Sequence, residues 1–225
     1  MDVDVLLYEG FDELDAIGPY ETFATAADRG ADLDVSTVTR EPVDRVAASH
    51  GLRVEPDGVL EEPDLLVVPG GGWNGRDDRG TWGEYRRNEL PPVLRAKHDA
   101  GATLASVCTG AMLLERAGLL DGRPAITHAG ALEDLRETAA EVVEARDDDG
   151  GSGVPRVVDG EERGSSGRMS EAVPRVVDDG DVLTAGGVTS GIDLALWILE
   201  REFDRKLADR VATTLEYDRG EVYRV

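Results

Sequence analysis

Short apolar runs alternate along the chain with segments whose apolar positions recur at a helical period. Runs apolar enough for strands buried on both faces occupy residues 3–8 (VDVLLY), 64–68 (DLLVV), 103–107 (TLASV) and 182–185 (VLTA). Helical patterns occupy residues 19–29, 82–100 in two pieces, 111–117, 192–199 and 206–217. Strands that alternate with helices predict an α/β fold, a three-layer sandwich whose mostly parallel sheet carries helices on both faces.

Residues 147–172 interrupt this alternation. The segment is rich in glycine, serine and charge, too polar to pack into a core. A chain of 225 residues with 40% apolar content is suited to one domain with a buried core. We therefore predict a single domain over residues 1–225 with a flexible, acidic insertion at about 147–172.

A short internal repeat surrounds the same region. The letters VPRVVD occur at residues 154–159 and again at 173–178. Only the second copy leads directly into "DGDVLTAGG", so we predict a strand at 175–177 and a turn at 179–180. The first copy forms either an outer strand or a disordered segment.

Charge and residue usage exclude several classes of protein. The 47 acidic and 24 basic residues give a net charge of −23, which repels nucleic acid. No run approaches the roughly 18 apolar residues of a membrane helix, and the acidic N-terminus is unlike a secretory signal, which predicts a cytoplasmic protein. One cysteine cannot form an internal disulfide, and three scattered histidines lack metal-ligand spacing, so we expect neither metal nor cofactor.

The single cysteine, Cys108, lies where an apolar strand is predicted to end and a helix to begin. Open α/β sheets bind ligands at this carboxyl edge. A thiol at a helix N-terminus is close to free N–H groups and the positive end of the helix dipole, which favour the thiolate. The pattern therefore predicts a nucleophile elbow with a lowered Cys108 pKa, with the Thr109 N–H as an oxyanion donor. An inert buried cysteine is the alternative.

Other strand ends supply candidate partners for Cys108. In "VVPGGG" (residues 67–72), Gly71 is the candidate second oxyanion donor, the alternative being a simple tight turn. Asp15 lies just before a helix start expected at Gly18 and Pro19, and acts either as a proton shuttle or as a helix N-cap or first-turn carboxylate. His128, 20 residues after the cysteine, forms either a Cys–His pair or a structural contact.

Four motifs together resemble the ThiJ/PfpI superfamily: "DxxGPYExF" at 15–23, "VVPGGG", "SVCTGAMLLERAGLLDGRPAITH" at 106–128 and "TAGGVTSGIDLALWILE" at 184–200. The resemblance implies a class I glutamine amidotransferase-like fold and a homodimer. It implies that Cys108 is the nucleophile, Asp15 the acidic residue beside it, and Gly71 and Thr109 the oxyanion donors. His128 matches a histidine common in this branch, with Ala129 where tryptophan often follows.

Within the superfamily, "CTGA" beside "AGGVTSGIDLAL" is similar to isonitrile hydratases and to the sensor half of some AraC-type regulators. Aspartate at position 15, where the deglycase branches usually have glutamate, favours isonitrile hydration to a formamide. The alternatives are a glyoxalase, deglycase or amide hydrolase, and a non-catalytic redox or ligand sensor that uses Cys108. The regulators carry a helix-turn-helix domain that this sequence, up to Val225, does not contain, so we expect a small-molecule substrate and no DNA.

The acidic surplus predicts a protein adapted to a salt-rich cytoplasm, as in halophilic archaea. A charge of −23 repels itself in dilute buffer, whereas at molar salt the Debye length falls to about 3 Å and screens that repulsion. We expect the melting temperature to be higher in about 2 M KCl than in about 50 mM KCl. Equal melting temperatures would indicate an ordinary acidic protein.

Overall fold

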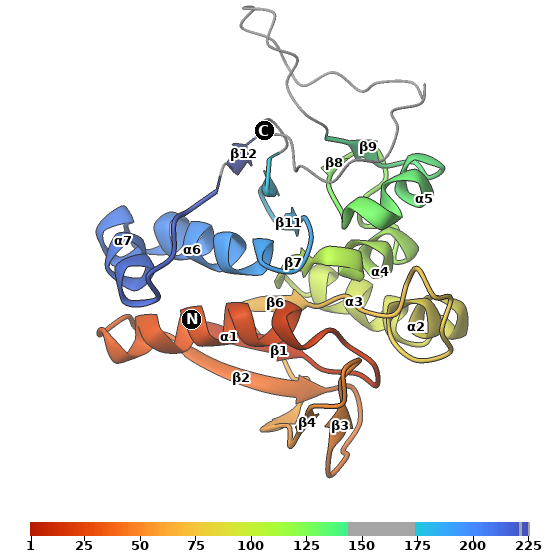
Figure 1. Cartoon of the computed structure of the whole chain (residues 1–225), viewed down its shortest axis with the longest axis horizontal. Coiled ribbons are helices and arrows are strands. Elements are labelled where there is room, and N and C mark those ends of the chain that lie inside the picture. The colour runs from red at the N-terminus through yellow and green to blue at the C-terminus, as the bar shows by residue number, and fades with distance from the viewer. Residues whose placement is uncertain (144–173, 221, 225) are drawn as a thin grey trace, which may run out of the picture.

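The computed structural model describes residues 1–143, 174–220 and 222–224. Its main sheet has eight strands in the order β12-β10-β11-β7-β6-β1-β2-β5 (Figure 1). The strands of this sheet are β1 Asp2–Leu6, β2 Asp34–Thr39, β5 Gly58–Val59, β6 Leu65–Val68, β7 Thr103–Val107, β10 Val176–Asp179, β11 Val182–Ala185 and β12 Val222–Arg224. Two small two-stranded ladders pair β3 Val46–Ala47 with β4 Arg53–Val54, and β8 Pro124–Ala125 with β9 Glu141–Val142.

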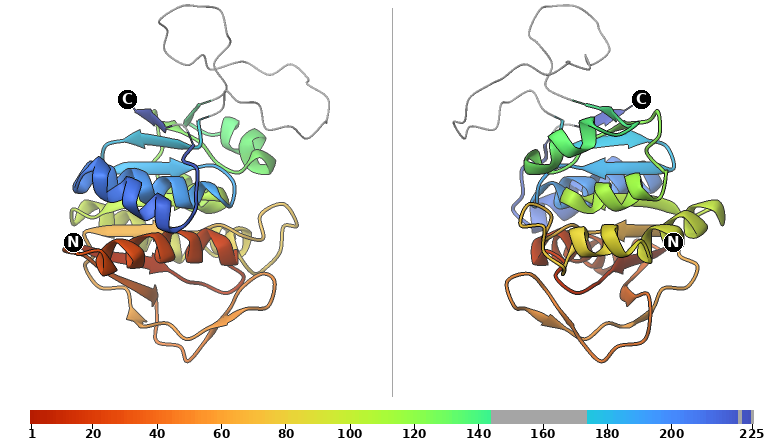
Figure 2. Two further views of the ribbon diagram at one scale, coloured as in Figure 1. Left: turned by 60° about the vertical axis from the view of Figure 1, so that its left-hand side comes forward. Right: turned by 90° about the vertical axis from the view of Figure 1, so that its right-hand side faces the viewer.

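Helices cover both faces of the main sheet, which confirms the predicted α/β sandwich (Figure 2). One face carries α1 Glu13–Asp28, α6 Ser190–Glu202 and α7 Arg205–Thr214, and the other carries α2 Thr81–Arg87, α3 Leu90–Asp99 and α4 Ala111–Arg116. The short α5 Leu132–Arg136 lies beside β8 and β9. Among the described residues, no helix is long and apolar enough to cross a membrane.

The central strands are parallel and buried on both faces, as their continuous apolar runs predict. The pairs β2–β1, β1–β6, β6–β7 and β7–β11 are all parallel, and only β10 runs antiparallel to its neighbour β11. All four residues of β6 and of β11 are buried. The carboxyl ends of β1, β6, β7 and β11 therefore lie at one edge of the sheet, where the candidate chemistry was expected.

The first helix begins earlier than the sequence argument predicts. It starts at Glu13, with the Asp12 carboxylate accepting a hydrogen bond from the Leu14 N–H at 3.2 Å, and Pro19 lies inside it. Proline removes one N–H from the helix, and its ring packs against Gly191 of α6, where a Cβ would lie 3.1 Å from the ring. The predicted start at Gly18 and Pro19 is wrong, and Asp15 therefore lies in the first turn.

The second VPRVVD copy forms a strand, as predicted, but its limits are shifted. Strand β10 covers Val176–Asp179, and the turn to β11 uses Gly180 and Asp181, with the Gly180 N–H donating to the Asp178 carboxylate at 2.9 Å. The predicted turn at Asp179 and Gly180 is therefore one residue early. The first copy and the predicted flexible insertion at 147–172 lie outside the described residues.

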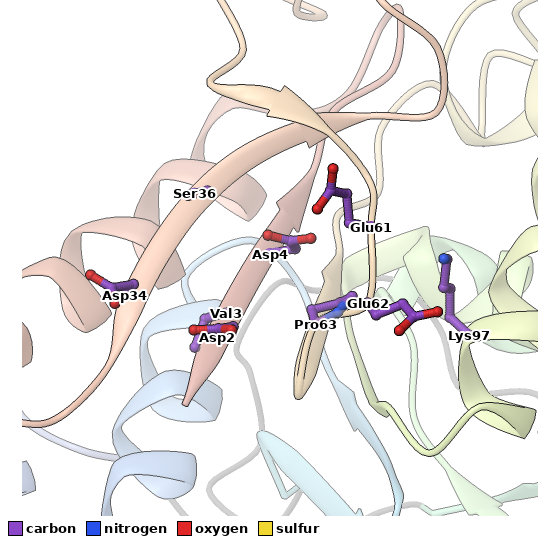
Figure 3. A pocket seen from close by; sticks show the side chains of 9 residues that line it. All are labelled: Asp2, Val3, Asp4, Asp34, Ser36, Glu61, Glu62, Pro63 and Lys97. Atoms are coloured by element: carbon purple, nitrogen blue, oxygen red, sulfur yellow. The ribbon is translucent and has the colours of Figure 1, made fainter.

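Acidic side chains gather at the opposite edge of the sheet, where the parallel strands begin (Figure 3). They line a groove of about 570 Å³ made by Asp2, Val3, Asp4, Asp34, Ser36, Glu61, Glu62, Pro63 and Lys97. Burial, with added repulsion from Asp2 and Glu61, raises the pKa of Asp4 to about 6. The raised pKa of Asp4 is a local example of the repulsion between carboxylates that the net charge of the chain implies. The acidic groove lies at the opposite end of the strands from Cys108.

Candidate active site

Cys108 lies at a sharp turn between β7 and the helical segment that follows. Its φ is +57°, in the left-handed region that non-glycine residues rarely adopt. The Cys108 N–H donates to the Gly186 carbonyl at 2.8 Å, and its carbonyl accepts from the Thr127 hydroxyl at 2.9 Å. Gly110 completes the turn, because a Cβ there would lie 2.2 Å from the Val68 carbonyl oxygen. The predicted strand-turn-helix elbow is therefore present.

Three segments meet at the elbow through the backbone of Gly70. The Gly70 N–H donates to Asp15 Oδ2 at 2.9 Å. A Cβ at Gly70 would lie 2.5 Å from the nitrogen and hydroxyl of Thr109 and 3.0 Å from Asp15 Oδ2. Only glycine lets the end of β6 approach both α1 and the elbow this closely. The contact places the Asp15 carboxyl near the Cys108 thiol, close enough for each group to shift the pKa of the other.

Asp15 is completely buried and has a strongly perturbed carboxyl group. Burial, followed by repulsion from Asp12, raises its pKa from 3.8 to about 7, although the Gly70 N–H opposes this shift. Asp15 Oδ1 is buried without a well-formed hydrogen bond. The carboxyl therefore holds a proton up to about neutral pH.

The prediction that helix-terminal dipoles lower the Cys108 pKa is wrong. Burial raises the pKa of the thiol, and the negative charge of Asp15 raises it further, although the N–H groups of Val188 and Thr109 lower it. Burial outweighs the backbone donors because the sulfur loses water on most sides. Since Cys108 and Asp15 each shift the pKa of the other, they titrate as a pair in which one negative charge opposes the formation of the second.

Gly71 and Thr109, the two predicted oxyanion donors, belong to a chain of hydrogen bonds behind the elbow. The Gly71 N–H donates to the Thr109 hydroxyl at 3.0 Å, which lies 3.2 Å from the Thr81 hydroxyl. Thr81 lies 3.0 Å from the Tyr8 hydroxyl, which donates to the Pro69 carbonyl at 2.5 Å. The Thr109 N–H faces the sulfur, whereas the Gly71 N–H already has a partner.

His128 lies beside the elbow. A Cβ at Gly187 would lie 2.8 Å from the imidazole ring, and Gly187 follows the Gly186 carbonyl that binds the Cys108 N–H. His128 Nδ1 accepts the Gly130 N–H at 3.0 Å, which leaves Nε2 to carry the proton of the neutral ring. Within the described part of the chain, no hydrogen bond joins His128 to the Cys108 sulfur.

Two residues of the site were not predicted from the sequence: Gly70, which binds Asp15 and packs against Thr109, and Val188, whose N–H favours the charged form of Cys108. Gly70 was within the quoted "VVPGGG" motif, but the prediction chose its neighbour Gly71. Val188 belongs to the glycine-rich "TAGGVTSGID" segment, whose position between a strand and a helix was the available signal. A backbone N–H has no sequence signature, so only the folded chain identifies this donor.

One group of possible metal ligands lies near the start of α1. Among the described residues, atoms of Asp12, Glu13 and His50 lie within 4.8 Å of one another. Glu13 uses its oxygens to accept hydrogen bonds from the His50 backbone and ring, both at 2.8 Å. Burial alone would raise the pKa of Glu13, but the hydrogen bonds from the His50 ring and from the backbone N–H groups of Glu13, His50 and Leu52 lower it to about 2. The trio therefore fastens the loop at His50 to α1.

The fold and the elbow define a class of protein: an α/β sandwich with a cysteine at the carboxyl edge of a parallel sheet and a buried acid beside it. The model of the DJ-1/PfpI family matches residues 1–201, and the chain belongs to that family. This confirms the superfamily expected from the motifs.

Individual relatives are more distant. The chain is 29% identical over 220 residues to an isonitrile hydratase from Pseudomonas putida, a match that covers 96% of this chain and 78% of the relative. It is 28% identical to the HTH-type transcriptional regulator CdhR from Pseudomonas aeruginosa, over 92% of this chain and 52% of the regulator. A crystal structure of a ThiJ/PfpI family protein from Pseudomonas syringae has a TM-score of 0.71 at 24% identity, covering 96% of this chain and 75% of that one.

The raised pKa of Asp15 predicts a pH-dependent cost in stability. The folded protein keeps this proton up to about pH 7, whereas the ordinary pKa is 3.8, so the free energy of unfolding falls as the pH rises between these values. Asp15→Asn cannot ionise and avoids this loss. We expect the variant to gain about 2 to 4 kcal/mol over wild type between about pH 4 and pH 8 in urea unfolding.

The control is Asp28→Asn, at the exposed end of the same helix. Its difference from wild type should stay nearly constant over this pH range. A constant difference for Asp15→Asn as well would contradict the raised pKa.

Proposed function

We propose that this protein adds water to a small isonitrile to give an N-substituted formamide, with Cys108 as the nucleophile and Asp15 as the proton donor and acceptor. The observation that carries the proposal is a fully buried carboxyl group, with a pKa of about 7, that lies near the single cysteine and interacts with it electrostatically. A general acid needs such a pKa to hold its proton near neutral pH. Similarity to an isonitrile hydratase along 96% of the chain supports the choice of substrate.

The thiol first transfers its proton to the Asp15 carboxylate, which gives the minor form of the pair, with the proton on Asp15 and the charge on sulfur. The N–H groups of Val188 and Thr109 stabilise this form, and protonation of Asp15 removes the charge that opposes thiolate formation. The thiolate attacks the terminal carbon of the isonitrile and forms a C–S bond. Asp15 transfers its proton to that carbon, which gives a thioimidate and an Asp15 carboxylate.

Water then resolves the thioimidate. The Asp15 carboxylate takes a proton from water as the hydroxide adds to the carbon, and passes that proton to the substrate nitrogen. As the carbonyl forms, the hydroxyl proton returns to Asp15 and the C–S bond breaks. The products are the formamide, the Cys108 thiolate and protonated Asp15, so one water has been added and the enzyme is restored. The protein residues supply every step of this scheme.

The other predicted site residues have supporting roles in this proposal. The Thr109 N–H stabilises negative charge on the sulfur or on the substrate, and the Gly71 N–H contributes only if it leaves the Thr109 hydroxyl. His128 lines the site beside Gly187. Ala129, which follows His128, is exposed. A tryptophan at this position would add a large side chain beside the site. The homodimer implied by the family remains a prediction.

Turnover of cyclohexyl isocyanide to the formamide tests the proposal. Cys108→Ala should lose all activity above background, because the covalent step is removed. Asp15→Asn keeps an acceptor for the Gly70 N–H but has no proton to transfer, so kcat should fall by about 10² to 10⁴. Asp28→Asn should retain wild-type turnover.

The same variants separate the alternatives. Lactate formation from methylglyoxal that depends on Cys108, without formamide formation, would assign the carbonyl chemistry of a glyoxalase. Oxidation of Cys108 by mild peroxide with turnover of neither substrate would assign a sensor. Formamide formation by Cys108→Ala at the wild-type rate would reject a cysteine mechanism.

A further inference from the structure

The loop that connects β11 to α6 contains a strained residue next to the nucleophile. Val188 has φ of +35°, and a β-branched side chain strongly disfavours this left-handed conformation. Such a conformation persists only where the surrounding structure fixes it. Val188 lies two residues after Gly186, whose carbonyl accepts the Cys108 N–H at 2.8 Å, and the Val188 N–H is near enough to the sulfur to favour its charged form. Some part of the structure must therefore hold Val188 in place.

Arg175 holds this loop at both ends. The Arg175 carbonyl accepts the Gly186 N–H at 2.9 Å, and its Nη2 donates to the Thr189 hydroxyl at 2.7 Å. Gly186 in turn accepts the Cys108 N–H at 2.8 Å. Arg175 thus binds Gly186 and Thr189, the residues on either side of Gly187 and Val188. Gly186 also binds the nucleophile.

Arg175 is itself fixed by a buried carboxylate. Its Nε donates to Asp193, whose side chain is 0% exposed in α6. Tyr217 donates to the same carboxylate at 2.8 Å and Gly220 at 2.5 Å, and Arg175 Nη2 also lies 3.1 Å from the Tyr217 hydroxyl. The guanidinium is planar and donates in fixed directions, so these partners set where it meets Thr189.

We propose that Arg175 is a positioning residue for the nucleophile: it holds Val188 in its strained conformation so that the Val188 N–H stays directed at the Cys108 sulfur. The inference rests on the proposed role of Cys108 as the nucleophile. The other groups near the sulfur are Asp15 from α1, the Thr109 N–H and the Tyr8 phenol. Arg175 contacts none of these three, so its effect must pass through the loop.

The test measures the rate at which iodoacetamide alkylates Cys108 in the full chain across a range of pH. Arg175→Met removes the guanidinium but keeps a long side chain. Losing one hydrogen bond to a charged sulfur should slow alkylation about tenfold at neutral pH and move the pH midpoint up by about one unit.

Arg201→Met is the matched control. Arg201 pairs with the buried Asp178 at 3.2 Å, and its side chain is 19% exposed, compared with 20% for Arg175. Arg201 also contacts the Gly180 carbonyl, at the opposite end of β11 from the elbow. This variant loses a similar ion pair and should alkylate at the wild-type rate.

Two further variants separate positioning from general loss of structure. Adding Val188→Gly to Arg175→Met should restore most of the rate, because glycine adopts a positive φ without support. Thr189→Val removes the hydroxyl that Arg175 binds and leaves the Arg175–Asp193 pair intact. It should slow alkylation by a smaller factor, and it decides the question if Arg175→Met fails to fold.

Wild-type rates in both Arg175→Met and Thr189→Val would overturn the inference, as would an equal loss in Arg201→Met or no rescue by Val188→Gly. These results leave the proposed function standing. If Cys108→Ala turns over cyclohexyl isocyanide at the wild-type rate, the nucleophile role fails first. If Arg175→Met is alkylated more slowly than wild type, and the activity of wild type depends on Cys108, the results support both the positioning role of Arg175 and the nucleophile role of Cys108.

Discussion

The close approach of Gly70 to the elbow is the constraint on which the candidate site depends. Its N–H binds Asp15, and its α-carbon leaves no space for a side chain against Thr109. The approach excludes water from the carboxyl and brings it against a thiol, so the two acids share a poorly solvated space. Full ionisation of both would place two negative charges side by side at low dielectric. A pair with one charge and one transferable proton follows from this geometry.

Two residues beside the same sulfur have a strained backbone. Cys108 and Val188 both have positive φ, and each such conformation costs about 1 to 2 kcal/mol for a residue with a side chain. The sheet supports them, because β7 lies between β6 and β11 and all three strands are almost wholly buried. The buried strands β7 and β11 fix the positions of the elbow and of the loop at Gly186. The hydrogen bond between Cys108 and Gly186 joins these two strained turns.

Local patterns predicted the parts of the structure that depend on local residues. The buried runs gave β6, β7 and β11 nearly to the residue, and the position of Cys108 at a strand end identified the elbow. The start of α1 was misplaced because Pro19 signals a first turn, while its support by Gly191 comes from a helix distant in sequence. The thiol pKa was misjudged for a related reason: a sequence shows the helix terminus but not how deeply Cys108 is buried. The role of Arg175 was invisible because its partners, Asp193 and Tyr217, come together only in the fold.

The described part of the chain contains three buried aspartates, and their surroundings distinguish Asp15 from the other two. Asp178 is 3% exposed and pairs with Arg201, and Asp193 is 1% exposed and pairs with Arg175. Buried carboxylates that serve structure alone are stabilised by such cations. Asp15, at 0% exposure, has no cation within ion-pair distance among the described residues, only one backbone N–H and the thiol. A buried acid without a counter-ion destabilises the fold whenever it ionises, so its position is explained by proton transfer better than by packing.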